Sequence, residues 1–184
     1  MSKPRPPQPA KLVISVLLAD KALLGDVLRQ LQSDFGTIDL KSPWMDFGYT
    51  DYYFAEMGRP LFRRMLAFGA LIQQQALSRV KLATNVIEQA FAQGQRRQVN
   101  IDPGYLLLER FVLATGKNFS HRIYIGDAIY ADLTLIYQKG GFQTLPWTYP
   151  DYAAAEMHLF LSQVRNTYAQ DLKASPAKRD GAGG

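Results

Sequence analysis

The first hundred residues alternate between short apolar runs and longer amphipathic segments. Residues 11–19 (KLVISVLLA) form a near-continuous apolar run, which predicts a strand buried on both faces. Residues 76–93 repeat apolar positions at helical spacing, which predicts an amphipathic helix. Residues 61–72 fit a strand or a short helix, and we expect the strand. The predicted order is strand, helix, strand, strand, helix, strand, at residues 11–19, 21–35, 37–40, 61–72, 76–93 and 98–101.

Capping residues and turn residues mark the ends of these elements. Asp20 is placed to cap the first helix, and Gly36 is placed to end it. After the strand at residues 98–101, the triplet Asp102-Pro103-Gly104 predicts a turn.

The second half of the chain predicts a helix, a hairpin and a final helix. Residues 106–115 (LLLERFVLAT) are expected to form a short buried helix, and residues 142–145 a short strand. Gly126-Asp127 lies between isoleucines and tyrosines and suits a type II′ hairpin turn. Asp151 is placed to cap a last helix, whose apolar stripe comprises Met157, Phe160, Leu161, Val164, Tyr168 and Leu172.

Together these elements predict an α+β fold with a ferredoxin-like βαββαβ core, an added β-hairpin and a C-terminal helix. A chain of 184 residues has room for one domain with a sizeable core. We place that domain at residues 11–172, with a disordered Pro-rich tail at residues 1–10 and a second disordered tail at residues 173–184.

The predicted hairpin places a histidine opposite a carboxylate. Counting outwards from the expected turn pairs His121 with Asp132, with Tyr130 on the same face and Arg122 on the opposite face. His121 could therefore act as a general acid or base that Asp132 orients. The same pair could instead be a cross-strand contact that only stabilises the sheet.

Further polar candidates lie close to this pair in the sequence. Asp102 follows the predicted strand at residues 98–101. An aspartate at the carboxyl end of a strand is either a functional carboxylate or a residue that forms the turn. Lys117 precedes the hairpin and is expected to stand close to His121. Lys117 and Arg122 together could clamp an anion.

Residues 42–58 form the most aromatic and least regular segment. Asp51, Tyr52 and Glu56 lie within it, and such a loop can line a pocket, hold a metal or plug one end of the core.

The helix at residues 76–93 carries Lys81, Asn85 and Glu88 on one polar face. The default expectation is a solvated face with a Lys–Glu pair, and the alternative is that Lys81 and Asn85 face an anionic ligand.

The net charge of +5 resides mainly in the tails. Residues 1–10 carry +2 and residues 173–184 carry +2, which leaves +1 for the domain. Because nucleic-acid binding needs a concentrated basic face, this distribution argues against a nucleic-acid partner.

The chain contains no cysteine, which excludes thiol catalysis, disulfides and cysteine-ligated metals. With only two histidines, a metal site would consist mainly of carboxylates and would favour magnesium, manganese or calcium over zinc. No apolar run reaches membrane-span length and the start lacks a secretory signal, so we expect a cytoplasmic protein.

Six runs of the sequence resemble a known family: GTIDL, TDYYFAEMG, KLATN, VNIDPGYL, KNFSHRIYIGDAIYADLTLIY and LPWTYPDY. They are similar to the signature runs of a bacterial and archaeal group catalogued as domain of unknown function 4416. The resemblance covers about residues 10–172 and implies a small single-domain protein of unassigned activity. In the family pattern a carboxylate precedes Thr50-Asp51 by two residues, whereas Gly48 stands there in this chain and Asp46 lies earlier. This departure argues against an obligate metal site in the loop.

Two functional hypotheses follow. The first is a small enzyme or ligand-binding protein for an anionic small molecule, such as a phosphate or a nucleotide. The second is a non-enzymatic adaptor or oligomeric subunit that binds a partner protein. A concave pocket containing both His121 and Asp51 would favour the first. A buried His121 pair beside a flat patch of exposed aromatic residues would favour the second, with the patch made of Trp44, Tyr49, Trp147 and Tyr149. A purely structural role for every polar residue named above is the third interpretation.

Overall fold

The computed structural model describes residues 3–48 and 51–174. These residues form four helices and one antiparallel sheet of nine strands, so the fold is α+β as predicted. The strand order is β2-β4-β1-β5-β6-β8-β7, with β3 paired to β4 and β9 paired to β8. The strands are β1 (Ala10–Leu18), β2 (Ile38–Lys41), β3 (Met45–Asp46), β4 (Phe62–Ile72), β5 (Val99–Leu106), β6 (Arg110–Thr115), β7 (Arg122–Gly126), β8 (Ile129–Gln138) and β9 (Gly141–Thr144). The helices are α1 (Leu24–Phe35), α2 (Phe54–Met57), α3 (Leu77–Ala90) and α4 (Ala155–Ala174), and short 3-10 turns precede α1 and α3.

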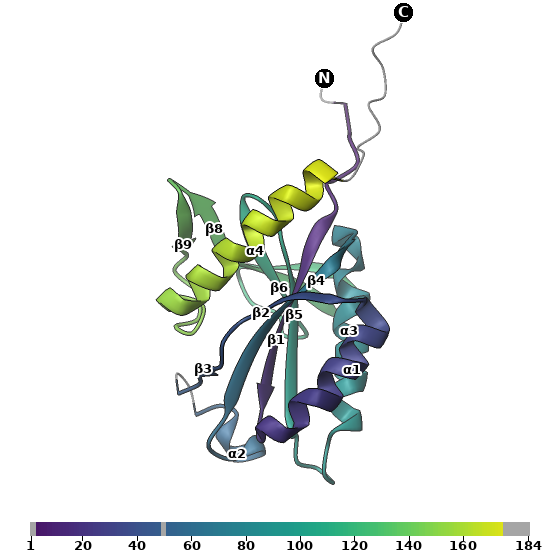
Figure 1. Ribbon diagram of the computed structural model, residues 1–184, viewed down its shortest axis with the longest axis vertical. Helices are drawn as coiled ribbons and strands as arrows, with labels where there is room; N and C mark the ends of the chain where they lie inside the picture. The colour runs from purple at the N-terminus through teal and green to yellow at the C-terminus, as the bar shows by residue number, and fades with distance from the viewer. Residues whose placement is uncertain (1–2, 49–50, 175–184) are drawn as a thin grey trace, which may run out of the picture.

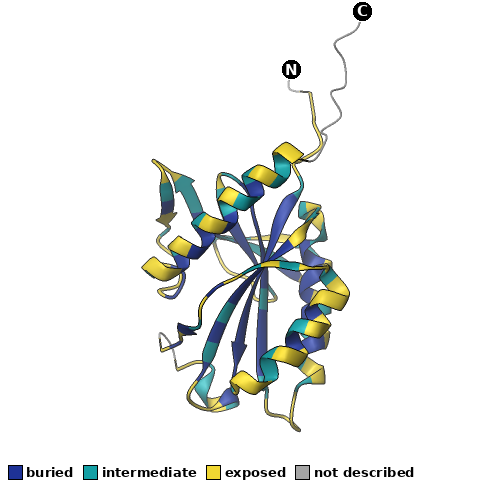
Figure 2. Ribbon diagram, in the orientation of Figure 1, coloured by how far each residue is buried: buried dark blue, intermediate teal, exposed yellow. Residues whose placement is uncertain are grey.

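Helices cover the two faces of the sheet differently. Helices α1 and α3 lie together on one face, and α4 crosses the other face (Figure 1). Strand β1 lies in the middle of the sheet, and all nine of its residues are buried (Figure 2). The alternating residues Leu12, Ile14 and Val16 pack in the same hydrophobic cluster as Val27 of α1 and Val80 of α3. The continuous apolar run is explained by this double burial.

Predicted elements in the first half are confirmed. Strands and helices occur in the order expected up to Ile101, with the short β3 and α2 added in the aromatic segment. A carboxylate oxygen of Asp20 accepts a hydrogen bond from the backbone N–H of Ala22 at 2.9 Å, in the turn that leads into α1. Gly36 ends α1 with a φ of 88°, a conformation that favours glycine.

The helix predicted at residues 106–115 is wrong. Strand β5 continues through Asp102, Pro103 and Gly104, and the chain then returns as β6. A short apolar run buried on both faces has no period that separates a strand from a helix, and this run forms a strand between β5 and β8. Asp102 therefore lies within a strand, and the predicted turn at this position is also wrong.

The predicted hairpin exists, but its register differs by one residue. The turn is formed by Asp127 and Ala128, which both have positive φ (54° and 58°), as a type I′ turn requires. Arg122, rather than His121, is the register partner of Asp132. A shift of one residue exchanges the two faces of a strand, and this places Arg122 on the side predicted for His121.

The two ends of the domain differ slightly from their predicted bounds. The carbonyl of Gln8 accepts a hydrogen bond from the Gln74 side chain at 2.9 Å, so this part of the predicted N-terminal tail contacts the domain. Helix α4 begins at Ala155, without Asp151 as its cap, and extends to Ala174. The remainder of the predicted C-terminal tail lies outside the described residues. Within residues 3–48 and 51–174, no helix is both long and apolar enough to span a membrane.

Strands β5 and β6 pair along only part of their length. Their register runs from Gly104 to Leu106 on β5 and stops there, although β5 remains paired with β1 back to Val99. Pro103 follows directly on the unpaired side of this boundary and has no N–H to donate to a neighbouring strand. The sheet therefore opens between β5 and β6 beyond Gly104.

Gly104 permits the close approach at the closed end of this opening. A Cβ atom at this position would lie 2.4 Å from the carbonyl oxygen of Val112, which is backbone and cannot move aside.

We expect Gly104→Ala to lower the free energy of unfolding by about 3 kcal/mol in denaturant titrations. Gly25→Ala in α1 is the matched control, since nothing lies within 4 Å of its Cβ position, and it should be neutral or stabilising. Equal stability of the two variants would contradict the close approach.

Candidate functional site

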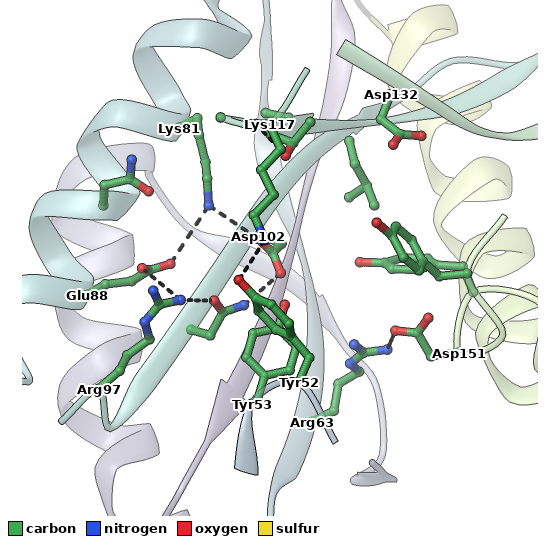
Figure 3. Close-up of a pocket in the computed structure, with 18 of the residues that line it drawn as sticks. Tyr52, Tyr53, Arg63, Lys81, Glu88, Arg97, Asp102, Lys117, Asp132 and Asp151 are labelled. Atoms are coloured by element: carbon green, nitrogen blue, oxygen red, sulfur yellow. Dashed lines mark hydrogen bonds and ion pairs between the residues drawn. The ribbon is translucent and has the colours of Figure 1, made fainter. Parts of the chain in front are cut away.

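A cavity of about 560 Å³ lies where β5 and β6 separate. Figure 3 shows its walls, with Lys81 and Glu88 on helix α3, Asp102 on β5, and Lys117 extending from beyond the end of β6. The aromatic segment contributes Tyr52 and Tyr53 to the wall of the cavity. The volume lies within the range of small-molecule binding sites.

Side chains of α3 replace the missing strand at the open edge of β5. The ammonium group of Lys81 donates to the carbonyl oxygen of Ile101 at 2.7 Å, and the backbone N–H of Ile101 donates to Glu88 Oε1 at 2.6 Å. Both backbone groups would otherwise be unsatisfied, at a cost of roughly 1–3 kcal/mol each when buried. The predicted Lys–Glu pair on α3 is present, with Lys81 Nζ 3.8 Å from Glu88 Oε1, but the predicted solvation is wrong, because the two side chains are only 10% and 11% exposed.

A connected polar network continues from this edge into the cavity. Lys81 Nζ lies 3.3 Å from Asp102 Oδ1, and the amide of Asn100 donates to Asp102 Oδ2 at 2.7 Å. Arg97 donates to the amide oxygen of Asn100 at 2.6 Å and lies 3.8 Å from Glu88. Burial raises the pKa of Glu88, a shift that Asp102 reinforces and that Lys81, the Ile101 N–H and Arg97 oppose.

A second ion pair lies on the far side of the cavity. Arg63 NH1 lies 2.5 Å from Asp151 Oδ2, and both side chains are about nine-tenths buried. The guanidinium group also lies over the rings of Phe47 and Tyr152, 4.5 and 5.4 Å from their centroids. Burial, reinforced by Asp102, raises the pKa of the neighbouring Tyr53 hydroxyl, so this group remains a neutral hydrogen-bond donor and acceptor.

Arg122 holds the segment that carries Lys117. Its guanidinium group donates to Asp132 Oδ2 at 2.9 Å, to the carbonyl oxygen of Lys117 at 3.0 Å and to the Tyr149 hydroxyl at 2.9 Å. Three donors of one planar group thus fix three separate segments. The side chains of Arg122 and Asp132 are 8% and 7% exposed, so this ion pair is largely shielded from solvent.

Lys117 differs from the other cations that line the cavity. Arg63, Lys81, Arg97 and Arg122 each lie within 4 Å of a carboxylate. Lys117 has no such partner in the part of the chain that the structure describes, and its ammonium group donates to the Tyr52 hydroxyl at 2.6 Å. The same ammonium group lies 4.2 Å from the centroid of the Tyr52 ring. Lys117 is therefore the cation whose charge is available to a ligand.

His121 contacts Asp132 but does not line the cavity. Its Nε2 atom lies 3.2 Å from Asp132 Oδ2, the same oxygen that accepts from Arg122. The imidazole ring stacks on Trp147 with 4.9 Å between centroids and meets the edge of Phe119. These contacts hold His121 against Asp132 and Trp147, outside the cavity lining.

The sequence-predicted site residues divide into two groups. Those that line the cavity are Tyr52, Lys81, Asn85, Asp102, Lys117, Arg122 and Asp132. Those that do not are Asp51, Glu56, His121 and Tyr130. Asp51 forms an exposed ion pair with Arg59 at 2.6 Å, and Tyr130 packs edge-on against Tyr124. Glu56 lines an adjoining hollow of about 350 Å³ and lies 3.3 Å from Arg97.

Of the residues of the predicted aromatic patch, Trp147 and Tyr149 are 37% and 52% exposed. Trp44 is half-buried beneath Lys21 and Arg64, and Tyr49 lies outside the described residues. Trp147 donates its ring N–H to the carbonyl of Leu133 at 2.8 Å and stacks on His121, while Tyr149 accepts from Arg122.

Several cavity residues were missed by the sequence analysis. The omitted members include Arg63, Arg97, Asn100 and Asp151, and Glu88 was treated as solvated. Arg63 left a signal, because an arginine within an apolar strand must find a buried partner. Nothing in the sequence identifies that partner as Asp151, since the two lie 88 positions apart.

Among residues 3–48 and 51–174, no three histidine, aspartate or glutamate side chains converge closely enough to hold a metal ion. The four carboxylates that line the cavity each face a lysine or an arginine instead.

Glu88 predicts a specific pH dependence of stability. Because its pKa is higher in the folded than in the unfolded protein, ionisation of Glu88 destabilises the fold as pH rises through the folded pKa. Glu88→Gln keeps an oxygen for the Ile101 N–H but cannot ionise. We expect the free energy of unfolding of wild type, minus that of Glu88→Gln, to fall as the pH rises above the ordinary glutamate pKa of about 4.3. Denaturant titrations at a series of pH values measure this difference, and Glu109→Gln, at an exposed glutamate, is the control. A difference that stays constant or rises with pH would contradict the assignment.

In a comparison with protein-family models, residues 8–168 match the family described as Domain of unknown function (DUF4416). No curated protein and no solved structure matches the chain. Since the matched region covers most of the chain, from the start of β1 into α4, and agrees with the resemblance seen in six separate runs of sequence, the protein belongs to the family of domain of unknown function DUF4416.

Proposed function

We propose that the cavity between β5 and β6 binds a small anionic molecule of the phosphate or nucleotide type. The observation that carries this proposal is Lys117, the cavity cation without a carboxylate partner among the described residues. A ligand anion would supply the partner that the protein does not. Arg122 supports the proposal because it holds the Lys117 backbone in place from the adjacent hairpin.

The neutral walls of the cavity also suit such a ligand. Tyrosines 52, 53, 149 and 152 line it and offer ring faces and hydroxyl groups. Aromatic faces stack on planar groups such as nucleobases, and hydroxyl groups donate to phosphate oxygens. The proposal concerns binding first. If the bound molecule reacts, Asp102 and Glu88 are the proton-transfer groups placed in the cavity wall, while His121 lies outside it.

We also propose that β1, α1, β2, β4, α3 and β5 form a ferredoxin-like unit to which β6 to β9 are added. The antiparallel strand order β2-β4-β1-β5, with both helices on one face, supports this assignment. The cytoplasm remains our proposed compartment, which the absence of cysteine supports.

A protein partner is the alternative function, and one surface favours it. Phe119, Ile123 and Tyr124 are each at least 60% exposed, and the last two lie on the edge strand β7. Exposed apolar groups on a sheet edge suit association with another chain. This surface is separate from the cavity, so the two functions make different predictions.

Substitution of Lys117 tests the proposed function. We expect Lys117→Met to weaken binding of inorganic phosphate and of adenosine monophosphate by about tenfold or more, measured by isothermal titration calorimetry, because a charge-assisted hydrogen bond is lost. Stability should change by less than about 0.5 kcal/mol, since Lys117 is exposed and forms no ion pair with any described residue. Lys41→Met, an exposed lysine outside the cavity, is the matched control.

Two results would contradict the proposal. The first is that the wild-type protein binds neither phosphate nor adenosine monophosphate. Binding that is equal in wild type and Lys117→Met would place the anion elsewhere on the molecule.

A further inference from the structure

The binding space extends beyond the surroundings of Lys117. The main cavity of about 560 Å³ and the adjoining hollow of about 350 Å³ share Asn85, Glu88 and Arg97 as lining residues. Asn85 and Glu88 belong to helix α3, whereas Lys117 follows strand β6, so different elements line the two parts of the binding space. A site of this size accommodates an organic molecule and is much larger than an inorganic anion requires.

Asn85 is a polar side chain without a partner in the described part of the chain. It lies on α3 between Lys81 and Glu88, is half-buried, and lines both the cavity and the hollow. Lys81 and Glu88 both form hydrogen bonds with the backbone of Ile101. By contrast, no hydrogen bond or ion pair joins Asn85 to a described residue. Its amide therefore offers two donors and an acceptor to a ligand.

Asp102 is the most accessible carboxylate of the cavity. Its side chain is 31% exposed, against 7–11% for Glu88, Asp132 and Asp151. One Asp102 oxygen faces Lys81 and the other accepts from Asn100, so each retains a lone pair for a further donor.

The charge of Asp102 decides which donor it suits. Lys81 already compensates the negative charge at 3.3 Å, so a second cation, such as the ammonium group of an amino acid, would gain little from it. Neutral hydroxyl groups use the remaining lone pairs without adding charge. Paired carboxylate and amide groups are suited to hydroxyl groups on adjacent carbons, as in the recognition of ribose by an acidic residue.

We infer that the ligand is a phosphorylated sugar, with its phosphate at Lys117 and its hydroxyl groups at Asn85 and Asp102. This inference rests on the proposed function, because it assigns the second end of the same ligand. It adds that the two ends are recognised by separate side chains, so affinity for the sugar and affinity for the phosphate can be changed independently.

Calorimetric titration with two probes separates these ends. The probes are inorganic phosphate and ribose 5-phosphate, and the proteins are wild type, Asn85→Leu, Lys117→Met and the control Asn166→Leu on the exposed side of α4. Leucine matches the size of asparagine without its hydrogen bonds. Because Asn85 contacts no described residue by hydrogen bond, its replacement should leave the fold intact, and a thermal melt of each variant checks this.

We expect wild type to bind ribose 5-phosphate at least about tenfold more tightly than phosphate, with Asn85→Leu removing most of this preference while phosphate affinity stays within about twofold. Lys117→Met should weaken both probes, and Asn166→Leu neither. Equal affinity of wild type for the two probes, or a preference retained in Asn85→Leu, would overturn the sugar subsite while leaving the anion site standing. Unchanged binding of both probes to Lys117→Met, or no binding to wild type, would overturn the proposed function and the inference together.

Discussion

The cavity depends on how the backbone of one residue, Ile101, is satisfied. In a continuous sheet its N–H and C=O would pair with β6, but that pairing stops at Gly104. Glu88 and Lys81 of helix α3 accept and donate in place of the missing strand, at 2.6 and 2.7 Å. Without these two contacts the open edge would carry unsatisfied buried groups, which native proteins avoid. The helix therefore makes it possible for the sheet to open.

The charges of the cavity follow from the same arrangement. At the edge of β5, Lys81 pairs with Asp102 and Glu88 lies close to Arg97, so these four side chains form one network. Arg63 and Asp151 form a separate ion pair across the cavity. Each charge within these groups is compensated, which limits the cost of burial. Lys117 stands apart because it lies on the segment that Arg122 fixes from the hairpin. A ligand that pairs with Lys117 gains an interaction without breaking an existing ion pair.

The elements up to Ile101 could be predicted because their periods are clear and their ends carry caps, as at Asp20 and Gly36. The failures are concentrated at residues 106–115 and at the hairpin. The former run is apolar throughout, so periodicity could not separate strand from helix. In the latter, the turn lies one residue later than Gly126 suggested, and a register shift between Tyr124 and Gly126 offsets the pairing further along β7, so that Arg122 rather than His121 pairs with Asp132. Seven of the predicted site residues line the cavity. Its ion pairs, however, join residues far apart in the sequence, and these contacts cannot be predicted when the pairing of the strands is unknown.

The most direct test of this account is hydrogen exchange at the backbone amide of Ile101, measured by NMR. If Glu88 replaces the missing strand, this amide should be protected in wild type and should exchange rapidly in Glu88→Ala. The amide of Asn100, whose register partner Leu17 lies in β1, should remain protected in both proteins. Equal protection of Ile101 in wild type and Glu88→Ala would contradict the account, because another group would then have to close the edge of β5.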